Sequence, residues 1–285
     1  MLKNYLKIAF RNLIKHKRFS FINILGLAIG LACFILITLW VQDELSYDTF
    51  YENADNIYLS LRGENGKLGG VTSQSLAPAL REEVPEVVDA TTCIELPKIM
   101  KSYLKKENIG FEQDLVLADT LFFNVFSFKF KAGDPNTAVV DQNSIVLTEH
   151  LAKKLFGEQN AVGESLELTI LGTTNSLKVT GVLENIPHNS HIQCEAFIPI
   201  SYVAQIVANN GIQNWANWGN HGAHTYILTR SNVNIAELEQ KIVDCERSHQ
   251  PNSKLENLQY SLLPLKRIHL HATQIEYFTA TGDIK

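Results

Sequence analysis

The 285-residue chain has few cysteines, only two methionines and a single long hydrophobic run. Its cysteines lie at positions 33, 93, 194 and 245, too far apart to form a recognisable disulfide framework. Acidic residues are absent from the first 42 residues, which carry a formal charge of +6, so that residues 43–285 carry −11. The larger part of the chain therefore lacks the basic surface of a nucleic-acid-binding domain, and no nucleic-acid partner is expected.

The sequence also lacks the short motifs of common enzymes. It contains no G-x-x-x-x-G-K-[ST], no G-x-S-x-G and no H-E-x-x-H. Residues 63–68, Gly-Glu-Asn-Gly-Lys-Leu, resemble a phosphate loop, but Leu68 stands where a metal-binding hydroxyl is needed, and a hairpin-like turn is predicted instead. We therefore expect no enzyme activity, no catalytic residues and no cofactor.

Histidine and cysteine do not predict a metal site either. Three histidine pairs are close in sequence: His188 and His191, His221 and His224, and His269 and His271. Structural zinc usually needs four ligands, and no cysteine or carboxylate cluster completes these pairs, so polar turn or strand histidines are predicted. Three cysteines follow the hydrophobic run; one disulfide among them and small buried side chains are both open, with burial favoured. Carboxylate pairs such as Glu82 and Glu83 are expected to be solvated.

The hydrophobic run, residues 19–41, contains no charged residue. At about 1.5 Å per residue a helix of this length spans roughly 35 Å, enough to cross a membrane core of about 30 Å. A cleavable signal peptide would have a shorter apolar stretch. Six basic residues before the run and acids directly after it place the N-terminus in the cytoplasm. We expect a single-pass protein of a bacterial inner membrane, with its main domain, residues 42–285, in the periplasm.

Two features suggest contacts within or at the membrane. Residues 1–18 place apolar side chains at helical spacing with lysines on the other face, which predicts an interfacial amphipathic helix; a basic retention signal without fixed geometry is the alternative. Gly26 and Gly30 form a G-x-x-x-G pattern, which allows another helix to approach closely. We interpret these glycines as helix-packing residues.

The periplasmic part is predicted to be an α+β domain. Strand, helix and strand patterns occur at 57–61, 75–84 and 87–96, and again at 225–229, 235–247 and 258–263. Between these two βαβ-like units lies a β-rich insertion with a hairpin loop predicted at 172–175 and one helix between an N-cap at Thr148 and a stop at Gly157. The expected boundaries are about 52–105 and 222–275 for the α/β part and about 106–221 for the insertion.

Two tryptophans lie close together near the end of the insertion. Trp215 and Trp218, within Asn-Trp-Ala-Asn-Trp-Gly-Asn at 214–220, are suited to stacking on a ligand or to anchoring at an interface. They are equally suited to fixing a loop onto the core, and the sequence does not decide between these possibilities.

Several segments taken together resemble a known family. The segments are NILGLAIGLA at 23–32, VQDELSYD at 41–48, FYENADNIY at 50–58, FFNVFSF at 122–128, SIVLTE at 144–149, AKKLFG at 152–157, VTGV at 179–182, IPHNSH at 186–191, PL at 264–265 and IHLH at 268–271. In this order and spacing the chain resembles permeases of MacB/FtsX-type ABC transporters, particularly those common in Bacteroidetes.

The resemblance implies a first membrane helix followed by a periplasmic core domain with a Porter-like α/β part and an inserted Sabre-like β-rich part. It implies a separate cytoplasmic ABC ATPase as partner and assembly as a homodimer or as a heterodimer with another permease. ATP hydrolysis by the partner would move the periplasmic domain for export, extraction or envelope signalling. The family's periplasmic domain has no catalytic residues to carry over.

The chain departs from the family pattern near its end. The resemblance implies three more membrane helices, and this sequence stops at Lys285, about where the next would begin. We therefore expect a permease-subunit fragment. The alternative is a single-pass membrane-anchored periplasmic sensor or adaptor, although about 18 cytoplasmic residues are too few for an output domain, since stable domains typically need at least about 50.

Overall fold

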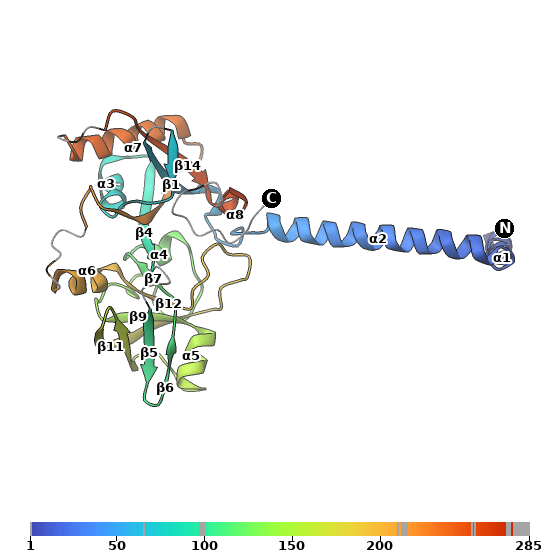
Figure 1. Ribbon diagram of the computed structural model, residues 1–285, viewed down its shortest axis with the longest axis horizontal. Helices are drawn as coiled ribbons and strands as arrows, with labels where there is room; N and C mark the ends of the chain where they lie inside the picture. The colour runs from blue at the N-terminus through green and yellow to red at the C-terminus, as the bar shows by residue number, and fades with distance from the viewer. Residues whose placement is uncertain are drawn as a thin grey trace. The chain divides into compact units, whose positions relative to one another are not determined.

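The computed structural model describes residues 2–64, 66–96, 101–209, 211, 216–251, 253, 255–271 and 275, with Leu2 described by its backbone only. The chain divides into two compact units, residues 1–46 and 47–285 (Figure 1). The first unit is helical, and the second holds the whole β-sheet.

The first unit consists of α1 (Leu2–Lys15) and α2 (Lys17–Leu45), separated at His16, whose backbone leaves the helical region. The predicted amphipathic helix and apolar helix are thus confirmed as helices. Within the described residues, α2 is the one helix that is long and apolar enough to cross a membrane. Its apolar side chains are exposed, as a helix that faces lipid requires.

The second unit is built on one mixed sheet. The described strands are β1 (Ile57–Glu64), β2 (Lys67–Gly69), β3 (Thr72–Ser73), β4 (Val87–Glu95), β5 (Ser102–Lys106), β6 (Ile109–Glu112), β7 (Leu115–Ala118), β8 (Phe130–Gly133), β9 (Ser144–Thr148), β10 (Ser165–Ile170), β11 (Thr173–Leu183), β12 (Ala196–Pro199), β13 (His221–Thr229) and β14 (Leu258–Pro264). Their order is β14-β1-β13-β4-β7-β12-β9-β11-β10-β5-β6, with β2, β3 and β8 paired beside this path.

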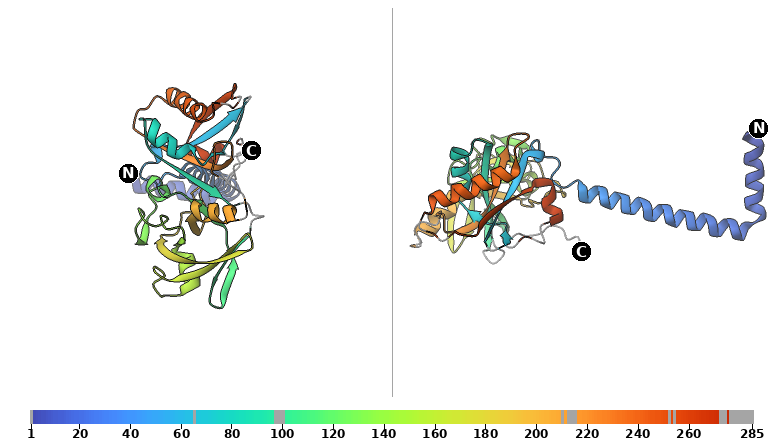
Figure 2. Two further views of the ribbon diagram at one scale, coloured as in Figure 1. Left: turned by 90° about the vertical axis from the view of Figure 1, so that its left-hand side faces the viewer. Right: turned by 90° about the horizontal axis from the view of Figure 1, so that it is seen from above.

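The two predicted βαβ-like units are confirmed, and they interleave rather than form separate layers. Helix α3 (Leu76–Glu83) leads into β4, and α7 (Ile235–His249) connects β13 to β14. Because β13 lies antiparallel between β1 and β4, and β1 lies antiparallel between β13 and β14, each unit encloses a strand of the other. Both helices cover the same face, where Leu80, Ile227 and Ile242 belong to one core (Figures 1 and 2).

The opposite face of these strands is covered by aromatic side chains around α4 (Phe122–Val125). Phe122, Phe123 and Phe126 are fully buried, and the ring of Phe122 contacts the other two rings. Tyr226 of β13 packs edge-on against Phe126, with ring centroids 4.8 Å apart. Strands buried on both faces explain the continuous apolar runs of the sequence in this region.

The β-rich segment has its own core, formed with α5 (Glu149–Phe156) and α6 (Ile200–Asn209). Thr148 caps α5 by accepting the Leu151 N–H at 3.4 Å, and Gly157 ends the helix with φ of +64°, as predicted. The predicted hairpin loop at 172–175 is wrong, because residues 173–175 already pair with β10. The turn is Leu171-Gly172, both with positive φ, as two-residue hairpins favour.

The sheet is continuous between the two predicted parts, since β4 pairs with β7, and β5 pairs with β10 at the far end. The division into an α/β part and an insertion near residue 106 therefore stays a prediction. The segment after β14 forms η2 (Leu265–Arg267) and α8 (Ile268–His271), and η1 (Ala54–Asn56) precedes β1. All four cysteines are free, and Cys93, Cys194 and Cys245 are buried, which confirms the burial interpretation.

Candidate functional site

The chain enters the second unit through a turn that contains Asp48. Helix α2 ends at Leu45, and Asp48 adopts φ of +56°, the left-handed region that aspartate tolerates better than most residues. Its side chain has no exposed surface. A buried carboxylate is costly unless it is paired and hydrogen-bonded, so the partners of Asp48 define this site.

Asp48 pairs with the turn at residues 187–191, which Ser190 closes by donating its N–H to Pro187 O at 3.2 Å. Asp48 Oδ1 accepts the backbone N–H of His191 at 3.0 Å and lies 2.9 Å from His191 Nδ1. In return, Asp48 N–H donates to Asn189 O at 2.9 Å. Two segments that are 143 residues apart in sequence are thereby joined.

Two buried tyrosines extend this network. His191 Nε2 lies 2.9 Å from the hydroxyl of Tyr226, and burial raises the pKa of Tyr226 well above its ordinary value. The phenol therefore stays neutral and donates to Nε2, and the tautomer assigned from these partners carries its proton on Nδ1, facing Asp48. The Tyr51 hydroxyl lies 3.1 Å from Ser190 Oγ, which donates to Asp48 Oδ1 at 3.4 Å.

A second contact joins the beginning of the unit to the segment after β14. The ring of Tyr47 stacks on His269 of α8, with ring centroids 3.4 Å apart and planes 8° from parallel. Lys266 Nζ lies 2.6 Å from Asp55 Oδ1 in the same pair of segments. We call Tyr47, Asp48, His191, Tyr226 and His269 the junction cluster, because they join the residues directly after α2 to three other segments of the domain.

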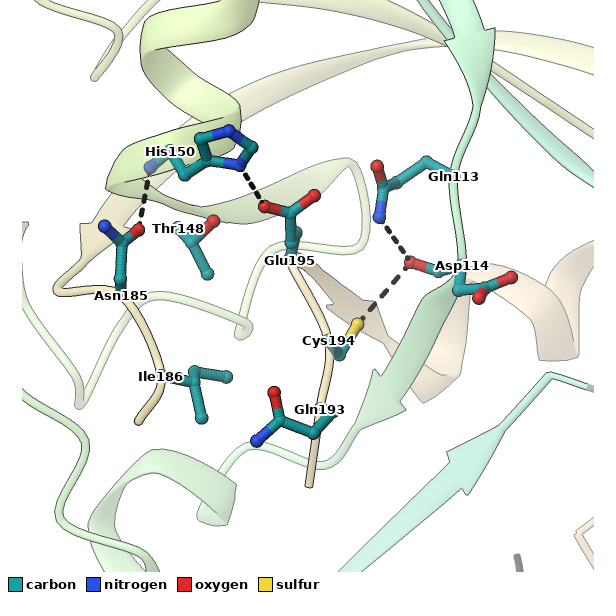
Figure 3. Close-up of a pocket in the computed structure, with 9 residues that line it drawn as sticks. All are labelled: Gln113, Asp114, Thr148, His150, Asn185, Ile186, Gln193, Cys194 and Glu195. Carbon is teal, nitrogen blue, oxygen red and sulfur yellow. Dashed lines mark hydrogen bonds and ion pairs between the residues drawn. The ribbon is translucent and has the colours of Figure 1, made fainter. Parts of the chain in front are cut away.

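A polar pocket of about 460 Å³ lies beside the same turn (Figure 3). Its walls are Gln113, Asp114, Thr148, His150, Asn185, Ile186, Gln193, Cys194 and Glu195. His150 Nδ1 lies 2.5 Å from Glu195 Oε1, and Asn185 Oδ1 accepts the His150 N–H at 2.9 Å. The pocket can therefore offer charged and neutral hydrogen-bonding groups to a polar ligand, with Ile186 as an apolar contact.

The segment from Asn185 to Glu195 belongs to both arrangements. Ser190 and His191 contact Asp48, while Asn185, Gln193 and Glu195 line the pocket. Gln193 also ties the turn together, since its Nε2 donates to Pro187 O at 2.8 Å. A ligand in the pocket would thus contact the segment that holds Asp48.

The structure places the predicted site residues without deciding their roles. Gly26 and Gly30 lie on the exposed surface of α2, with no other atom within 4 Å of a Cβ built on either. Trp215 lies outside the described residues. Trp218 stacks on His249, with ring centroids 4.6 Å apart and planes 13° from parallel, and packs against the core under α3 and α7. The helix-packing and interface assignments remain predictions.

Sequence reasoning missed the junction cluster, although most of its members lie in the family-like segments. Their partners are far away in sequence, so no spacing rule brings them together. Three histidines expected only to be polar are buried: His191, His224 and His269. His224 Nδ1 lies 2.8 Å from Gly70 O, and burial lowers the pKa of His224, which keeps the ring neutral. The one signal in the sequence for this cluster was Asp48, an acidic residue three positions after the end of α2.

The apolar helix and the interleaved sheet define the class of protein: an α/β domain that follows a helix of membrane-spanning length. A family model described as the MacB-like periplasmic core domain matches residues 20–244. The chain belongs to this family, and it carries the periplasmic domain of a MacB-like ABC transporter permease. The resemblance and the fold class inferred from the sequence are confirmed.

Similar proteins agree with this assignment. The ABC transporter permease YvrN of Bacillus subtilis (strain 168) is 24% identical over 295 residues, covering 96% of this chain and 68% of that protein. A domain of a permease protein from Porphyromonas gingivalis matches with a TM-score of 0.62 and 26% identity, over 75% of this chain and 92% of that one. The periplasmic region of MacB from Actinobacillus actinomycetemcomitans shares the fold, with a TM-score of 0.51 and 16% identity over 75% and 91%.

Proposed function

We propose that this chain acts as a permease subunit of a MacB/FtsX-type ABC transporter. In this proposal α2 crosses the inner membrane with the N-terminus in the cytoplasm, and the second unit lies in the periplasm. The charge of +6 on residues 1–42 and the acids Asp43 and Glu44 after the apolar run support this orientation. Within the second unit, the α/β strands would form the Porter-like part and the β-rich segment the Sabre-like part.

A cytoplasmic ABC ATPase supplies the energy in this proposal, and the junction cluster transmits the motion of α2 to the domain. The carrying observation is the burial of Asp48 against His191 three residues after α2 ends. In this proposal, a connection held by buried hydrogen-bonded groups absorbs less displacement than a flexible linker would. Movement of the end of α2 would therefore reach the turn at 187–191 and β13 directly.

Assembly as a homodimer, or as a heterodimer with another permease, would use the face of α2 that carries Gly26 and Gly30. Small residues four apart let two helices approach closely, and the exposed surface beside both glycines leaves room for such a partner. Replacing Gly30 by Leu should weaken this association, whereas Ala28→Leu, on the opposite side of the helix, should weaken it less. Chemical crosslinking in membranes under reducing conditions, which prevent disulfides through Cys33, measures how much of each variant is associated.

The partner is tested by recovering the intact chain from membranes under mild detergent and identifying its companions. The proposal expects a nucleotide-hydrolysing subunit in the complex. Protease accessibility in spheroplasts tests the orientation separately, and cleavage of the second unit only from the cytoplasmic side would contradict it. Three hydrophobic segments encoded downstream, in frame or just past a stop codon, would also favour the permease.

Transmission is tested by hydrogen exchange in the recovered complex. ATP with vanadate should change the exchange of residues 187–191 in the wild-type protein, and Asp48→Ala should abolish this change while ATP hydrolysis continues. Asp134→Ala is the matched control, because Asp134 is exposed and its side chain accepts hydrogen bonds from Asn136, away from the contacts of Asp48. An unchanged response in Asp48→Ala would show that the junction cluster does not transmit motion.

A single-pass sensor or adaptor is the second candidate, and the pocket beside the junction cluster favours it. A polar ligand bound there would contact the segment that holds Asp48, which would link binding to α2 without nucleotide hydrolysis. Recovery of a complex without any ATPase, together with ligand-dependent exchange at 187–191, would support this function over the permease.

A further inference from the structure

Three side chains with different metal-binding atoms meet where α3 and α7 end. Glu83 is the last residue of α3, and Cys245 and His249 lie one turn apart on α7. One carboxylate oxygen, the thiol sulfur and one ring nitrogen all lie within 4.8 Å of one another. Among the residues that the structure describes, no second group of three such side chains is as close.

The arrangement is held in place by its neighbours. His249 Nε2 lies 2.6 Å from Glu83 Oε1, and the ring of Trp218 stacks on the imidazole and restricts its orientation. Cys245 is buried, whereas 38% of the His249 side chain and 41% of the Glu83 side chain are exposed. The site is thus anchored at its sulfur and open toward solvent at its other two ligands.

The local charges favour a cation. Both helices end at the site, so their last carbonyl groups direct partial negative charge toward it. The nearby basic side chains are engaged elsewhere, Lys241 with Glu86 and Arg62 with Glu246. Glu83 thus adds a formal negative charge beside two helix C-termini.

We propose that Glu83, Cys245 and His249 form a Zn²⁺ site, with water as the fourth ligand. A cysteine and a histidine four residues apart on one helix share a face, which allows both to bind one ion. The mixture of sulfur, nitrogen and oxygen suits zinc, whereas Ca²⁺ and Mg²⁺ prefer oxygen ligands only. Three protein ligands with an accessible fourth position resemble an open zinc site rather than a closed structural one.

Binding requires two local changes. Ligands at about 2.0–2.3 Å from a tetrahedral ion lie farther apart than Glu83 and His249 do now, so this contact must open. Both side chains are partly exposed, which leaves room for the adjustment. Cys245 must also release its proton to solvent; burial, followed by the nearby Glu83 carboxylate, raises the pKa of this thiol to about 12, and a bound cation reverses that effect.

Cobalt is the direct probe of the sulfur ligand. The full-length chain is purified in detergent, reduced, stripped with a chelator and titrated with Co²⁺. We expect one equivalent to bind with a thiolate-to-cobalt absorption band in the near ultraviolet, and Zn²⁺ to remove the band by displacing Co²⁺. Because Trp218 stacks on His249, tryptophan fluorescence should fall in the same titration, and Trp218→Phe should lose most of this quenching.

Ligand variants test the assignment. Cys245→Ser should abolish the absorption band, and Glu83→Gln and His249→Ala should each weaken Zn²⁺ binding by at least about tenfold, since losing even an outer-shell partner typically costs about 10–100-fold. Glu83 and His249 are partly exposed, so these two variants keep the fold even if Cys245→Ser does not. His150→Ala is the matched control, because His150 also contacts a carboxylate but belongs to no three-ligand group.

Absence of the band, or its persistence in Cys245→Ser, would overturn the proposal. Equal weakening in His150→Ala would show surface binding unrelated to this site. The measurements need neither an ATPase nor transport, so their outcome is independent of the permease function.

Discussion

Asp48 combines three costly properties: a left-handed backbone, a buried carboxylate and dependence on partners that are distant in sequence. Only the pairing with His191 and the donors of the 187–191 turn offset the loss of hydration. Position 48 therefore requires both a carboxylate and a residue that tolerates the left-handed backbone. Comparing Asp48→Ala with Asp48→Asn separates these two requirements.

Replacing Asp48 by Ala should lower the free energy of unfolding by about 1–3 kcal/mol for each buried donor of His191 that loses its acceptor, namely the backbone N–H and the ring Nδ1–H. Denaturant unfolding of the full-length chain in detergent measures this change. Asp48→Asn, which tolerates the left-handed backbone, should lose less. A double-mutant cycle with His191→Ala should give a coupling of about 0.5–3 kcal/mol, and additive effects would contradict direct pairing.

The hydroxyl of Tyr226 makes a separate contribution. Tyr226→Phe removes the donor to His191 Nε2 and leaves a buried nitrogen unsatisfied, so the free energy of unfolding should fall by about 1–3 kcal/mol. Tyr202→Phe is the comparison, because that hydroxyl accepts a hydrogen bond from Asn175, which is half-buried and can bind water instead. Equal losses in the two variants would argue against a special role for the Tyr226 contact.

At the residue scale, the sequence predicted burial better than it predicted partners. Burial of the cysteines followed from the residue type alone, because a free cysteine behaves as a small hydrophobic side chain. Asp48 and His191, or Glu83 and Cys245, meet only after distant strands and helices have packed, and no local pattern encodes that meeting. Glu83 is exposed, as expected, but its contact with His249 was not predicted.

At the scale of elements, the turn between β10 and β11 contains a residue with an unfavourable conformation. Leu171 has φ of +51° and an exposed side chain, so burial does not compensate for the backbone cost. Asparagine followed by glycine is preferred in this type of two-residue turn. Leu171→Asn should therefore stabilise the domain by about 0.5–1 kcal/mol.

Denaturant unfolding of Leu171→Asn measures this gain in stability, and Gly172→Ala is the comparison variant expected to lose stability. Gly172 has φ of +76°, so a Cβ there should destabilise the turn by about 1–2 kcal/mol. Loss of stability in Leu171→Asn would mean that the turn conformation differs from the one described.

Helices and strands were largely predictable because their signals are local. Thr148 and Gly157 marked both ends of α5. The strand pattern at 57–61 falls within β1, and the pattern at 87–96 exceeds β4 by one residue. The interleaving of β13 between these strands was not predictable from the sequence, since register depends on side chains brought together from positions more than 100 residues apart. The turn at 171–172 was misplaced because leucine rarely adopts positive φ.

At the scale of the whole molecule, the continuous sheet predicts that residues 47–285 unfold together. The pairing of β4 with β7 joins the core under α3 and α7 to the core of the β-rich segment. Leu168→Ala and Ile227→Ala, one in each core, should both shift the same calorimetric transition, each costing about 2–5 kcal/mol. Two transitions, with only one shifted by each substitution, would show that the two parts fold separately.

The pairing of β1 with β14 also has a mechanical consequence. Tyr58 lies opposite Pro264, so the segments leading into β1 and out of β14 leave from the same end of two antiparallel neighbours. A force that pulled these two segments apart would break the hydrogen bonds between β1 and β14 one after another, starting at the Tyr58–Pro264 pair. A force that moved both segments in the same direction would leave these hydrogen bonds intact. The Tyr47–His269 stack and the Asp55–Lys266 ion pair join the same two segments outside the Tyr58–Pro264 pair. These two contacts would therefore bear a force on either segment before the strands begin to separate.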